Sequence, residues 1–426
     1  MKRRSLAQWL SFIEQSHPKE IELGLDRVAE VAARLQLDAS SARVITVAGT
    51  NGKGSCVAVC EALLIAAGQK VGVYTSPHLQ RYNERVRIGG EEVSDALLAE
   101  AFATVHEAAG STTLTYFEYG TLAALWLFMR GSLDVWVLEV GLGGRLDAVN
   151  IIDADVAVIT RIDIDHIDWL GNDRDSIAAE KAGILRAGKS AVCADREPPA
   201  SLRSIVEERS VRMHWIGRDF DVEQTDPLIW RWRGADDGAM ASSSAPLNGI
   251  IADNAVAAVQ AVALLDALPD TDTMSRLLPQ ITVPGRRQRI TVDRIKCILD
   301  VAHNPAGMRA LVDWLQASGA SPDVIVFAAM ADKDLDGLLQ PLAGIASRWM
   351  LPRLALPRAC EPGLLAKQIT ELNAAATCEI DSAVEHALKS AFELAGPGGT
   401  VLVCGSFFVV GPALDCLNAM LDTQGE

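Results

Sequence analysis

A glycine-rich stretch with a single lysine, Gly49–Ser55 (GTNGKGS), offers the clearest chemistry in this chain, and it follows the apolar run 44–48. Glycines let backbone N–H groups converge on phosphate oxygens, while Lys53 supplies a charge and Ser55 a hydroxyl for a metal ion. The alanine-rich run 55–67 predicts a helix whose amino end faces the phosphates. The stretch therefore predicts a nucleotide phosphate loop; the alternative is a glycine-rich turn without a ligand.

The match to the common phosphate-loop pattern GxxxxGK[ST] is imperfect. Val47 stands where the first glycine would be, and Gly54 separates Lys53 from Ser55. These departures disfavour a generic switch-type or motor-type NTPase.

Other polar residues follow the predicted strands of the same region. Ligands of open α/β sheets bind beyond the carboxyl ends of the strands, so residues there are expected to share one cleft. That cleft would gather Lys53, Ser76, Glu139, Asp147 and His166.

Glu139 interrupts the apolar run VWVLEVG, where an unpaired carboxylate would be costly to bury. A divalent metal ion that bridges to phosphate oxygens would satisfy it, with further ligands from Ser76 and His166. The alternatives are a carboxylate held by the amides of the following glycines, a structural histidine and a turn serine before Pro77.

Lys181 lies in the alanine-rich segment 178–185, which leaves few exposed positions. Burial would depress its pKa and make the amine reactive. From the residues alone, we favour an ion pair with Glu180 or a solvated helix face.

Composition restricts the class of protein. The 426 residues are 49% hydrophobic, enough for two or three domains, and the net charge of −16 with a pI near 4.9 argues against nucleic acid or an anionic membrane as partner. No secretion signal is evident, and the apolar run 401–414 is too short to span a bilayer. Eight cysteines without paired metal spacing predict reduced thiols in a cytoplasm.

Apolar β-branched runs alternate with helical stretches, which predicts an α/β fold with a largely parallel sheet. The expected elements of the first part are strands at 44–48, 71–75, 134–140 and 155–161 and helices at 54–67, 94–109 and 118–130. Leu6–Ile13 is expected to begin an amphipathic helix, and 218–248 to form a short hairpin excursion.

A second series begins after Pro284-Gly285, with strands near 296–301, 323–329 and 400–404 and helices at Met308–Ala317 and Ile380–Ala395. We place the boundary at about 283–290 and predict two domains, 1–285 and 286–426. The polar residues of the second series, which could close over the nucleotide from the other side, are Arg286, Arg287, Asp300, His303, Asn304 and Asp332-Lys333-Asp334. For Arg286 and Arg287 a solvated basic pair is an equal alternative, and Asn254 could simply cap a helix.

Taken together, these residues resemble the folylpolyglutamate synthase family, most closely its bifunctional bacterial members, which are also dihydrofolate synthases. The resemblance covers nearly the whole chain, and its motifs occur in the family's order: GTNGKGS, TSPHL with NERVRIGG, LTYFEYGTLAAL, LEVGLGGRLDAVN, DHIDWLG, EKAGILRAG, PGRRQ, LDVAHNP, DKD and CGSF. It implies a fold similar to that of Mur ligases, with a P-loop ATP-binding domain followed by a smaller Rossmann-like domain.

The resemblance also implies site residues. The metal ligands for Mg²⁺ would be Ser76, Glu139, His166 and a carboxylated Lys181. ATP contacts would be Thr50, Asn51, Gly52, Lys53, Gly54, Ser55, Asn254 (base), Arg286 and Asp300 (ribose). Dihydropteroate contacts would be Glu22, Leu23, Gly24, Leu25, Thr115, Tyr116, Phe117, Glu118, Leu146, Asp147 and Ala148. Departures from the family's motifs are Val149, Ala252, Asp253 and Arg287.

The function that the resemblance implies is ATP-dependent ligation of L-glutamate to dihydropteroate and to reduced folates through an acyl phosphate, by a cytoplasmic monomer whose partners are small molecules. Lys53, Arg145 and Arg286 would supply the local cations that an acidic protein needs for anionic substrates. The alternatives are a single-substrate or cell-wall-type amino acid ligase and, from another class, a nucleotide-dependent switch. The chain lacks the NKxD and DxxG set of such a switch.

Overall fold

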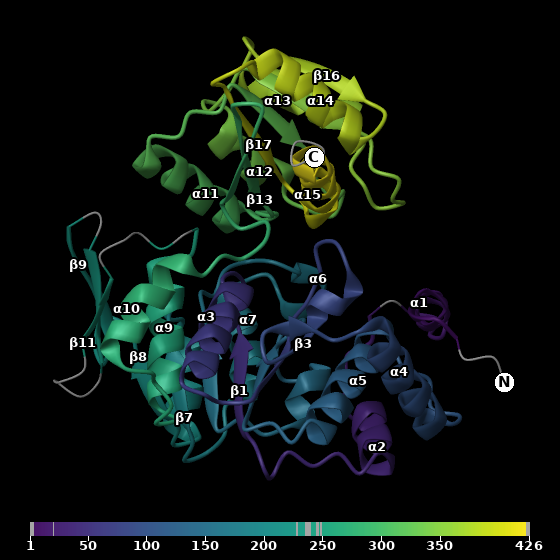
Figure 1. Ribbon diagram of the computed structural model, residues 1–426, viewed down its shortest axis with the longest axis vertical. Helices are drawn as coiled ribbons and strands as arrows, with labels where there is room; N and C mark the ends of the chain where they lie inside the picture. Colours follow the sequence, from purple (N-terminus) through teal and green to yellow (C-terminus); the bar gives the residue numbers. More distant parts are fainter. Residues whose placement is uncertain are drawn as a thin grey trace. The chain divides into compact units, whose positions relative to one another are not determined.

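The computed structural model describes residues 4–19, 21–226, 229–234, 240–243, 247 and 249–422, and the chain forms two compact units, Met1–Ile281 and Thr282–Glu426. Each unit has its own main sheet (Figure 1).

The first unit is built on an eight-stranded sheet of order β4-β3-β2-β5-β1-β6-β7-β8. From β2 to β8 the neighbouring strands are parallel, and β3 and β4 are added antiparallel at one edge. The strands are β1 Arg43–Ala48, β2 Val71–Tyr74, β3 Val86–Ile88, β4 Glu91–Glu92, β5 Val135–Glu139, β6 Val156–Ile159, β7 Ser190–Cys193 and β8 Arg212–Trp215.

Helices cover this sheet because its strands are apolar on both faces. Helices α3 and α9 pack side by side and contact the central strands (Figure 1). Other buried strand residues, among them Trp136 and Ile159, share a core cluster with Phe102, Phe128 and Ile177. The helices of the unit are α1 Leu6–Glu14, α2 Asp26–Arg34, α3 Lys53–Ala66, α4 Asp95–Ala109, α5 Tyr116–Arg130, α6 Ile167–Leu170, α7 Arg174–Lys181, α8 Ala200–Glu208, α9 Ala252–Ala263 and α10 Thr271–Leu277, with 3-10 turns η1 Tyr82–Arg85, η2 Ala148–Ile151, η3 Ala182–Ile184 and η4 Leu278–Gln280.

A small antiparallel sheet, β11-β10-β9, follows in the chain. Its strands are β9 Asp221–Asp226, β10 Ile229–Arg233 and β11 Met240–Ser243. The predicted short hairpin excursion at 218–248 is thus a three-stranded sheet; residues 227–228, 235–239, 244–246 and 248 of that range lie outside the described residues.

The second unit has a six-stranded sheet of order β12-β13-β17-β14-β15-β16, in which only β12 is antiparallel to its neighbour. Its strands are β12 Gln288–Val292, β13 Ile295–Asp300, β14 Val324–Phe327, β15 Arg348–Pro352, β16 Thr377–Asp381 and β17 Thr400–Cys404, and its helices are α11 Pro305–Ser318, α12 Leu335–Leu342, α13 Pro362–Leu372, α14 Val384–Ala395 and α15 Phe407–Asp422.

The predicted α/β class with a mostly parallel sheet is confirmed, as is the helix at Leu6. The predicted helix Ile380–Ala395 is wrong at its start. Ile380 belongs to strand β16, which pairs with β15, and the helix begins only at Val384.

Candidate active site

The glycine-rich loop connects β1 to α3, as predicted. Two of its glycines have positive φ, +154° at Gly49 and +93° at Gly52, and a Cβ at Gly49 would lie 1.7 Å from Oγ1 of Thr160. Glycine is therefore required here. Lys53 turns back over the loop and donates to the carbonyls of Gly49 at 3.0 Å and Thr50 at 3.3 Å. The ammonium group is thus held above a loop whose geometry suits phosphate.

The loop is fixed to the segment that follows β6. The hydroxyl of Thr50 donates to the carbonyl of Asp163 at 2.9 Å and accepts from its N–H at 3.0 Å. The hydroxyl of Thr160 donates to the carbonyl of Asn51 at 2.8 Å. The same segment leads into the predicted metal ligand His166, so both are positioned together.

Glu139 ends strand β5 and is only 5% exposed. Its Oε2 accepts the backbone N–H of Ser76 at 3.2 Å, and the same oxygen would lie 3.9 Å from a Cβ at Gly54. Predicted metal ligands and phosphate loop therefore meet at one place. A buried, hard oxygen donor beside a phosphate loop fits a divalent cation.

His166 is the N-cap residue directly before α6, with φ +53° and an imidazole that is 43% exposed. Its Nε2 lies 4.0 Å from the carboxylate of Asp165. Among the described residues, no group of three or more His, Cys, Asp or Glu side chains forms a metal cluster. The predicted site differs from such a cluster because it includes a serine and a modified lysine.

Lys181 ends α7 and is only 3% exposed. Burial, and to a smaller extent the charge of Lys53, lowers its pKa to about 7, although the carboxylates of Asp165 and Asp147 raise it. Within the described ranges its Nζ has no carboxylate at ion-pair distance. The expected ion pair with Glu180 is therefore wrong, because that carboxylate binds Arg145.

The segments predicted to bind dihydropteroate meet one another. Arg27 joins two of them, with contacts of 3.3 Å to Glu22 and 2.9 Å to Glu118. The N–H of Gly24 donates to the carbonyl of Leu146 at 3.4 Å. The segments Glu22-Leu23-Gly24-Leu25, Thr115-Tyr116-Phe117-Glu118 and Leu146-Asp147-Ala148 thus form one contiguous wall.

Two residues of this wall have specific surroundings. The ring of Phe117 lies against Gly141, where a Cβ would come within 2.6 Å of it. Asp147 accepts from the amides of Leu142 at 2.8 Å and Val149 at 3.0 Å, and burial raises its pKa to about 6. The loop after β5 is therefore shaped around these two side chains.

Asn254 does not cap helix α9, which is one of its predicted roles. The helix begins at Ala252, and its N-cap Ile251 has no side-chain cap. Asn254 is buried in the first turn, and its amide would lie 2.4 Å from a Cβ at Gly52. The predicted adenine contact thus borders the phosphate loop.

Arg286 and Asp300 belong to the second unit. Asp300 is buried, which raises its pKa, and it accepts from the amides of Arg287 at 3.0 Å and Ala302 at 2.8 Å. The guanidinium of Arg286 lies 5.3 Å from the ring centre of Phe407. Asn304 caps helix α11 by accepting from Gly307, so that side chain has a structural role in this unit.

Arg145, predicted to supply a local cation, is paired with Glu180 at 2.9 Å. A different arginine was missed. Arg85, on η1, is 8% exposed and donates to Nδ1 of His78 at 2.9 Å. Burial and the charge of Arg85 lower the pKa of His78 to about 4. The motifs TSPHL and NERVR contain both residues, but only the fold shows that they touch.

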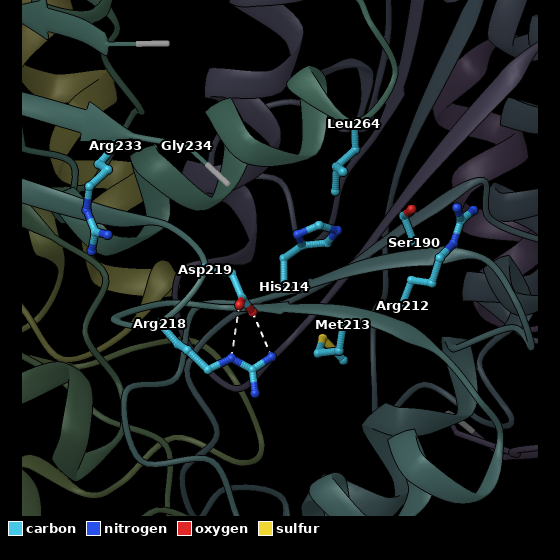
Figure 2. Close-up of a pocket in the computed structure, with 9 residues that line it drawn as sticks. All are labelled: Ser190, Arg212, Met213, His214, Arg218, Asp219, Arg233, Gly234 and Leu264. Carbon is cyan, nitrogen blue, oxygen red and sulfur yellow. Dashed lines mark hydrogen bonds and ion pairs between the residues drawn. The ribbon is translucent and has the colours of Figure 1, made fainter. Parts of the chain in front are cut away.

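A cavity of about 570 Å³ lies elsewhere in the first unit, beside the edge strand β8 (Figure 2). Its charged side chains point in different directions, and Arg218 is already bound to Asp219 at 2.9 Å. The phosphate loop follows β1 in the interior of the sheet. This cavity is therefore not part of the candidate site.

Two family models match the chain: the Mur ligase middle domain at residues 47–226 and the Mur ligase glutamate ligase domain at 285–407. A dihydrofolate synthase/folylpolyglutamate synthase of Escherichia coli is 41% identical over 97% of this chain and 96% of its own length.

Solved structures agree with this. Escherichia coli FolC in complex with DHPP and ADP superposes with a TM-score of 0.90 at 40% identity, covering 98% of both chains. The bifunctional folylpolyglutamate synthase/dihydrofolate synthase of Yersinia pestis, complexed with AMPPNP and a Mn ion, gives 0.87 at 40% identity, covering 97% of this chain and 98% of the other. In the part of the chain that is described, no helix is long and apolar enough to cross a membrane.

Proposed function

Since the chain belongs to the folylpolyglutamate synthase family of Mur ligases, we propose that it joins L-glutamate to 7,8-dihydropteroate and to reduced folates in ATP-dependent reactions. The observation that carries this proposal within the structure is the meeting of Ser76, Glu139 and Gly54 beside the lysine of the phosphate loop.

A carboxylate is a poor electrophile, so ligation in water needs activation. The substrate carboxylate attacks the γ-phosphorus of ATP, and the bond to the β,γ-bridging oxygen breaks to release ADP and leave an acyl phosphate. Lys53 neutralises charge on the transferred oxygens, while the loop amides hold the in-line geometry. The amine of L-glutamate then attacks the acyl carbon, loses a proton and displaces phosphate. No enzyme nucleophile is required.

A divalent cation, Mg²⁺ in our proposal, would be held by Ser76, Glu139 and His166 and would neutralise charge on the phosphate oxygens. Lys181 would join it as a carbamate formed with CO₂. Its burial without a carboxylate partner among the described residues supports this, because burial disfavours the protonated amine and the neutral amine is the form that reacts with CO₂. ATP would further be contacted by Asn254 at the base, by Asp300 at the ribose and by Arg286. The loop residues that would contact it beside Lys53 are Thr50, Asn51, Gly52, Gly54 and Ser55.

We assign residues 1–285 to ATP and pteroate binding and 286–426 to a ligase domain. All eight cysteines are free, which supports a cytoplasmic location, and we propose a monomer with small-molecule partners.

The test is an assay of purified protein with ATP, MgCl₂ and L-glutamate, with either dihydropteroate or a reduced folate. We expect phosphate release only when glutamate and a pteroyl acid are both present, and product masses that give the number of glutamates added. Activity on one acid alone would indicate a monofunctional ligase. Phosphate release without either acceptor would indicate a nucleotide switch and contradict the proposal. Replacing MgCl₂ by EDTA should abolish turnover.

A further inference from the structure

Arg85 is buried, and no carboxylate of the described residues lies at ion-pair distance from it. With the described residues its side chain makes one hydrogen bond, from Nε to Nδ1 of His78. The terminal nitrogens of its guanidinium make no hydrogen bond or ion pair with a described residue, and neither is fully buried. Buried cations are normally paired, so this arrangement calls for an anion that the described residues do not provide.

Neighbouring residues show that pairing was available but is used elsewhere. Arg87, two residues further along, binds Glu61 with Nη2 at 2.6 Å. The carboxylate of Glu84 accepts the backbone amides of Leu79 and Gln80, both at 2.7 Å. Neither acid forms an ion pair with Arg85.

The other neighbours of Arg85 are neutral aromatic rings. Its guanidinium lies 5.1 Å from the ring centre of Tyr82 and 5.4 Å from that of Tyr116. Burial raises the pKa of both phenols, so they carry no negative charge near pH 7. Stacking of this kind orients a planar guanidinium and leaves its hydrogen-bonding edge free.

The position of Arg85 connects it with the candidate substrate wall. Its carbonyl accepts the N–H of Thr75 at 2.9 Å, directly before Ser76, whose amide binds Glu139. Tyr116, on which it stacks, belongs to the predicted pteroate segment on α5. The free edge of the guanidinium is therefore close to where an acid substrate would bind.

We propose that Arg85 binds a carboxylate of the pteroyl substrate, and that His78 is a positioning residue that orients its guanidinium. This inference rests on the proposed function. The carboxylate is either the one that becomes phosphorylated, present in dihydropteroate and in folates, or the α-carboxylate of a glutamate already attached, present in folates alone.

The test compares binding of acids and their amides to the wild-type protein, Arg85→Gln, Arg85→Lys and the control Arg81→Gln. Arg81 lies in the same loop, but its side chain is 65% exposed. The probes are dihydropteroate against its carboxamide and a reduced folate against its α-carboxamide, titrated in the presence of ADP. Each amide lacks the charge of its acid but keeps its shape. The ratio of the two dissociation constants therefore isolates the contribution of the carboxylate contact.

We expect the wild-type and Arg81→Gln proteins to prefer at least one acid over its amide by roughly 10- to 100-fold, the range of a charge-assisted contact. Arg85→Gln should bring that ratio close to one, and Arg85→Lys should retain part of it. Loss in the dihydropteroate pair assigns Arg85 to the reacting carboxylate; loss in the folate pair alone assigns it to the α-carboxylate. Unchanged ratios in Arg85→Gln would overturn the inference, even if that variant is less stable.

In turnover assays, Arg85→Gln should raise KM for the pteroyl acid and leave KM for ATP within twofold. His78→Gln should show a smaller rise, since it loosens the arginine without removing it. If the wild-type protein ligates no glutamate at all, the proposed function fails. If the wild-type and Arg85→Gln proteins ligate glutamate equally well, the proposed function stands and only the role of Arg85 is refuted.

Discussion

Replacing Lys181 by methionine should stabilise the protein while abolishing its activity. The pKa of Lys181 falls from 10.5 to about 7 in the folded chain, mainly because of burial. Between these values only the unfolded chain holds the proton, so the folded state is penalised. The penalty vanishes above pH 10.5 and grows as pH falls toward 7.

At 1.36 kcal/mol per pKa unit, the full penalty below pH 7 is about 5 kcal/mol, and at pH 9 about 2 kcal/mol remains. Methionine has a similar length and no charge, so Lys181→Met should remove most of this penalty and raise the free energy of unfolding by nearly that amount. Its advantage over the parent protein should shrink by about 3 kcal/mol between pH 6 and pH 9.

The assay is urea unfolding followed by circular dichroism at both pH values, in buffer freed of CO₂. Lys189→Met is the matched control, since that lysine is half-exposed and paired with Asp155; its effect should be small and independent of pH. Adding ¹³C-bicarbonate to the parent protein should give a carbamate signal in NMR spectra that Lys181→Met lacks. If Lys181→Met unfolds at lower urea than the parent at pH 6, the reasoning from burial is refuted.

Two further outcomes test the site and its scaffold. Glu139→Ala should lower kcat by roughly a thousandfold or more, as expected when a charge-stabilising ligand is lost, with little change in urea midpoint; near-normal turnover would remove Glu139 from the metal site. Gly183→Ala should destabilise the protein by about 1–3 kcal/mol or more, as overpacking does, because its Cβ would lie 2.3 Å from Cα of Arg145. The control is Gly363→Ala in helix α13, where an added Cβ would have no neighbour within 4 Å; this variant should keep the melting temperature of the parent protein or raise it slightly.

The sequence predicts the parts of this molecule that depend on local pattern. The phosphate loop is recognisable because backbone geometry requires glycine at two positions within four residues, Gly49 and Gly52. Strand β17 has the predicted bounds because an apolar run between glycines leaves few alternatives. Membership of the family follows from ten motifs in order, each short but specific.

Prediction fails where tertiary contacts decide. Ile380 was placed in a helix, but pairing with β15 makes it part of a strand. Asparagine is a residue type that often caps helices, yet Asn254 lies within the first turn of α9, next to Gly52. The contact between Arg85 and His78 depends on the turn η1, and no spacing rule indicates it. The adjacent Glu180 suggests an ion pair with Lys181, but the carboxylate of Glu180 binds Arg145 instead.

The reciprocal hydrogen bonds between Thr50 and Asp163 join the phosphate loop to the segment that carries His166. A phosphate group that orders this loop would therefore also restrict the backbone that leads to the predicted metal ligand.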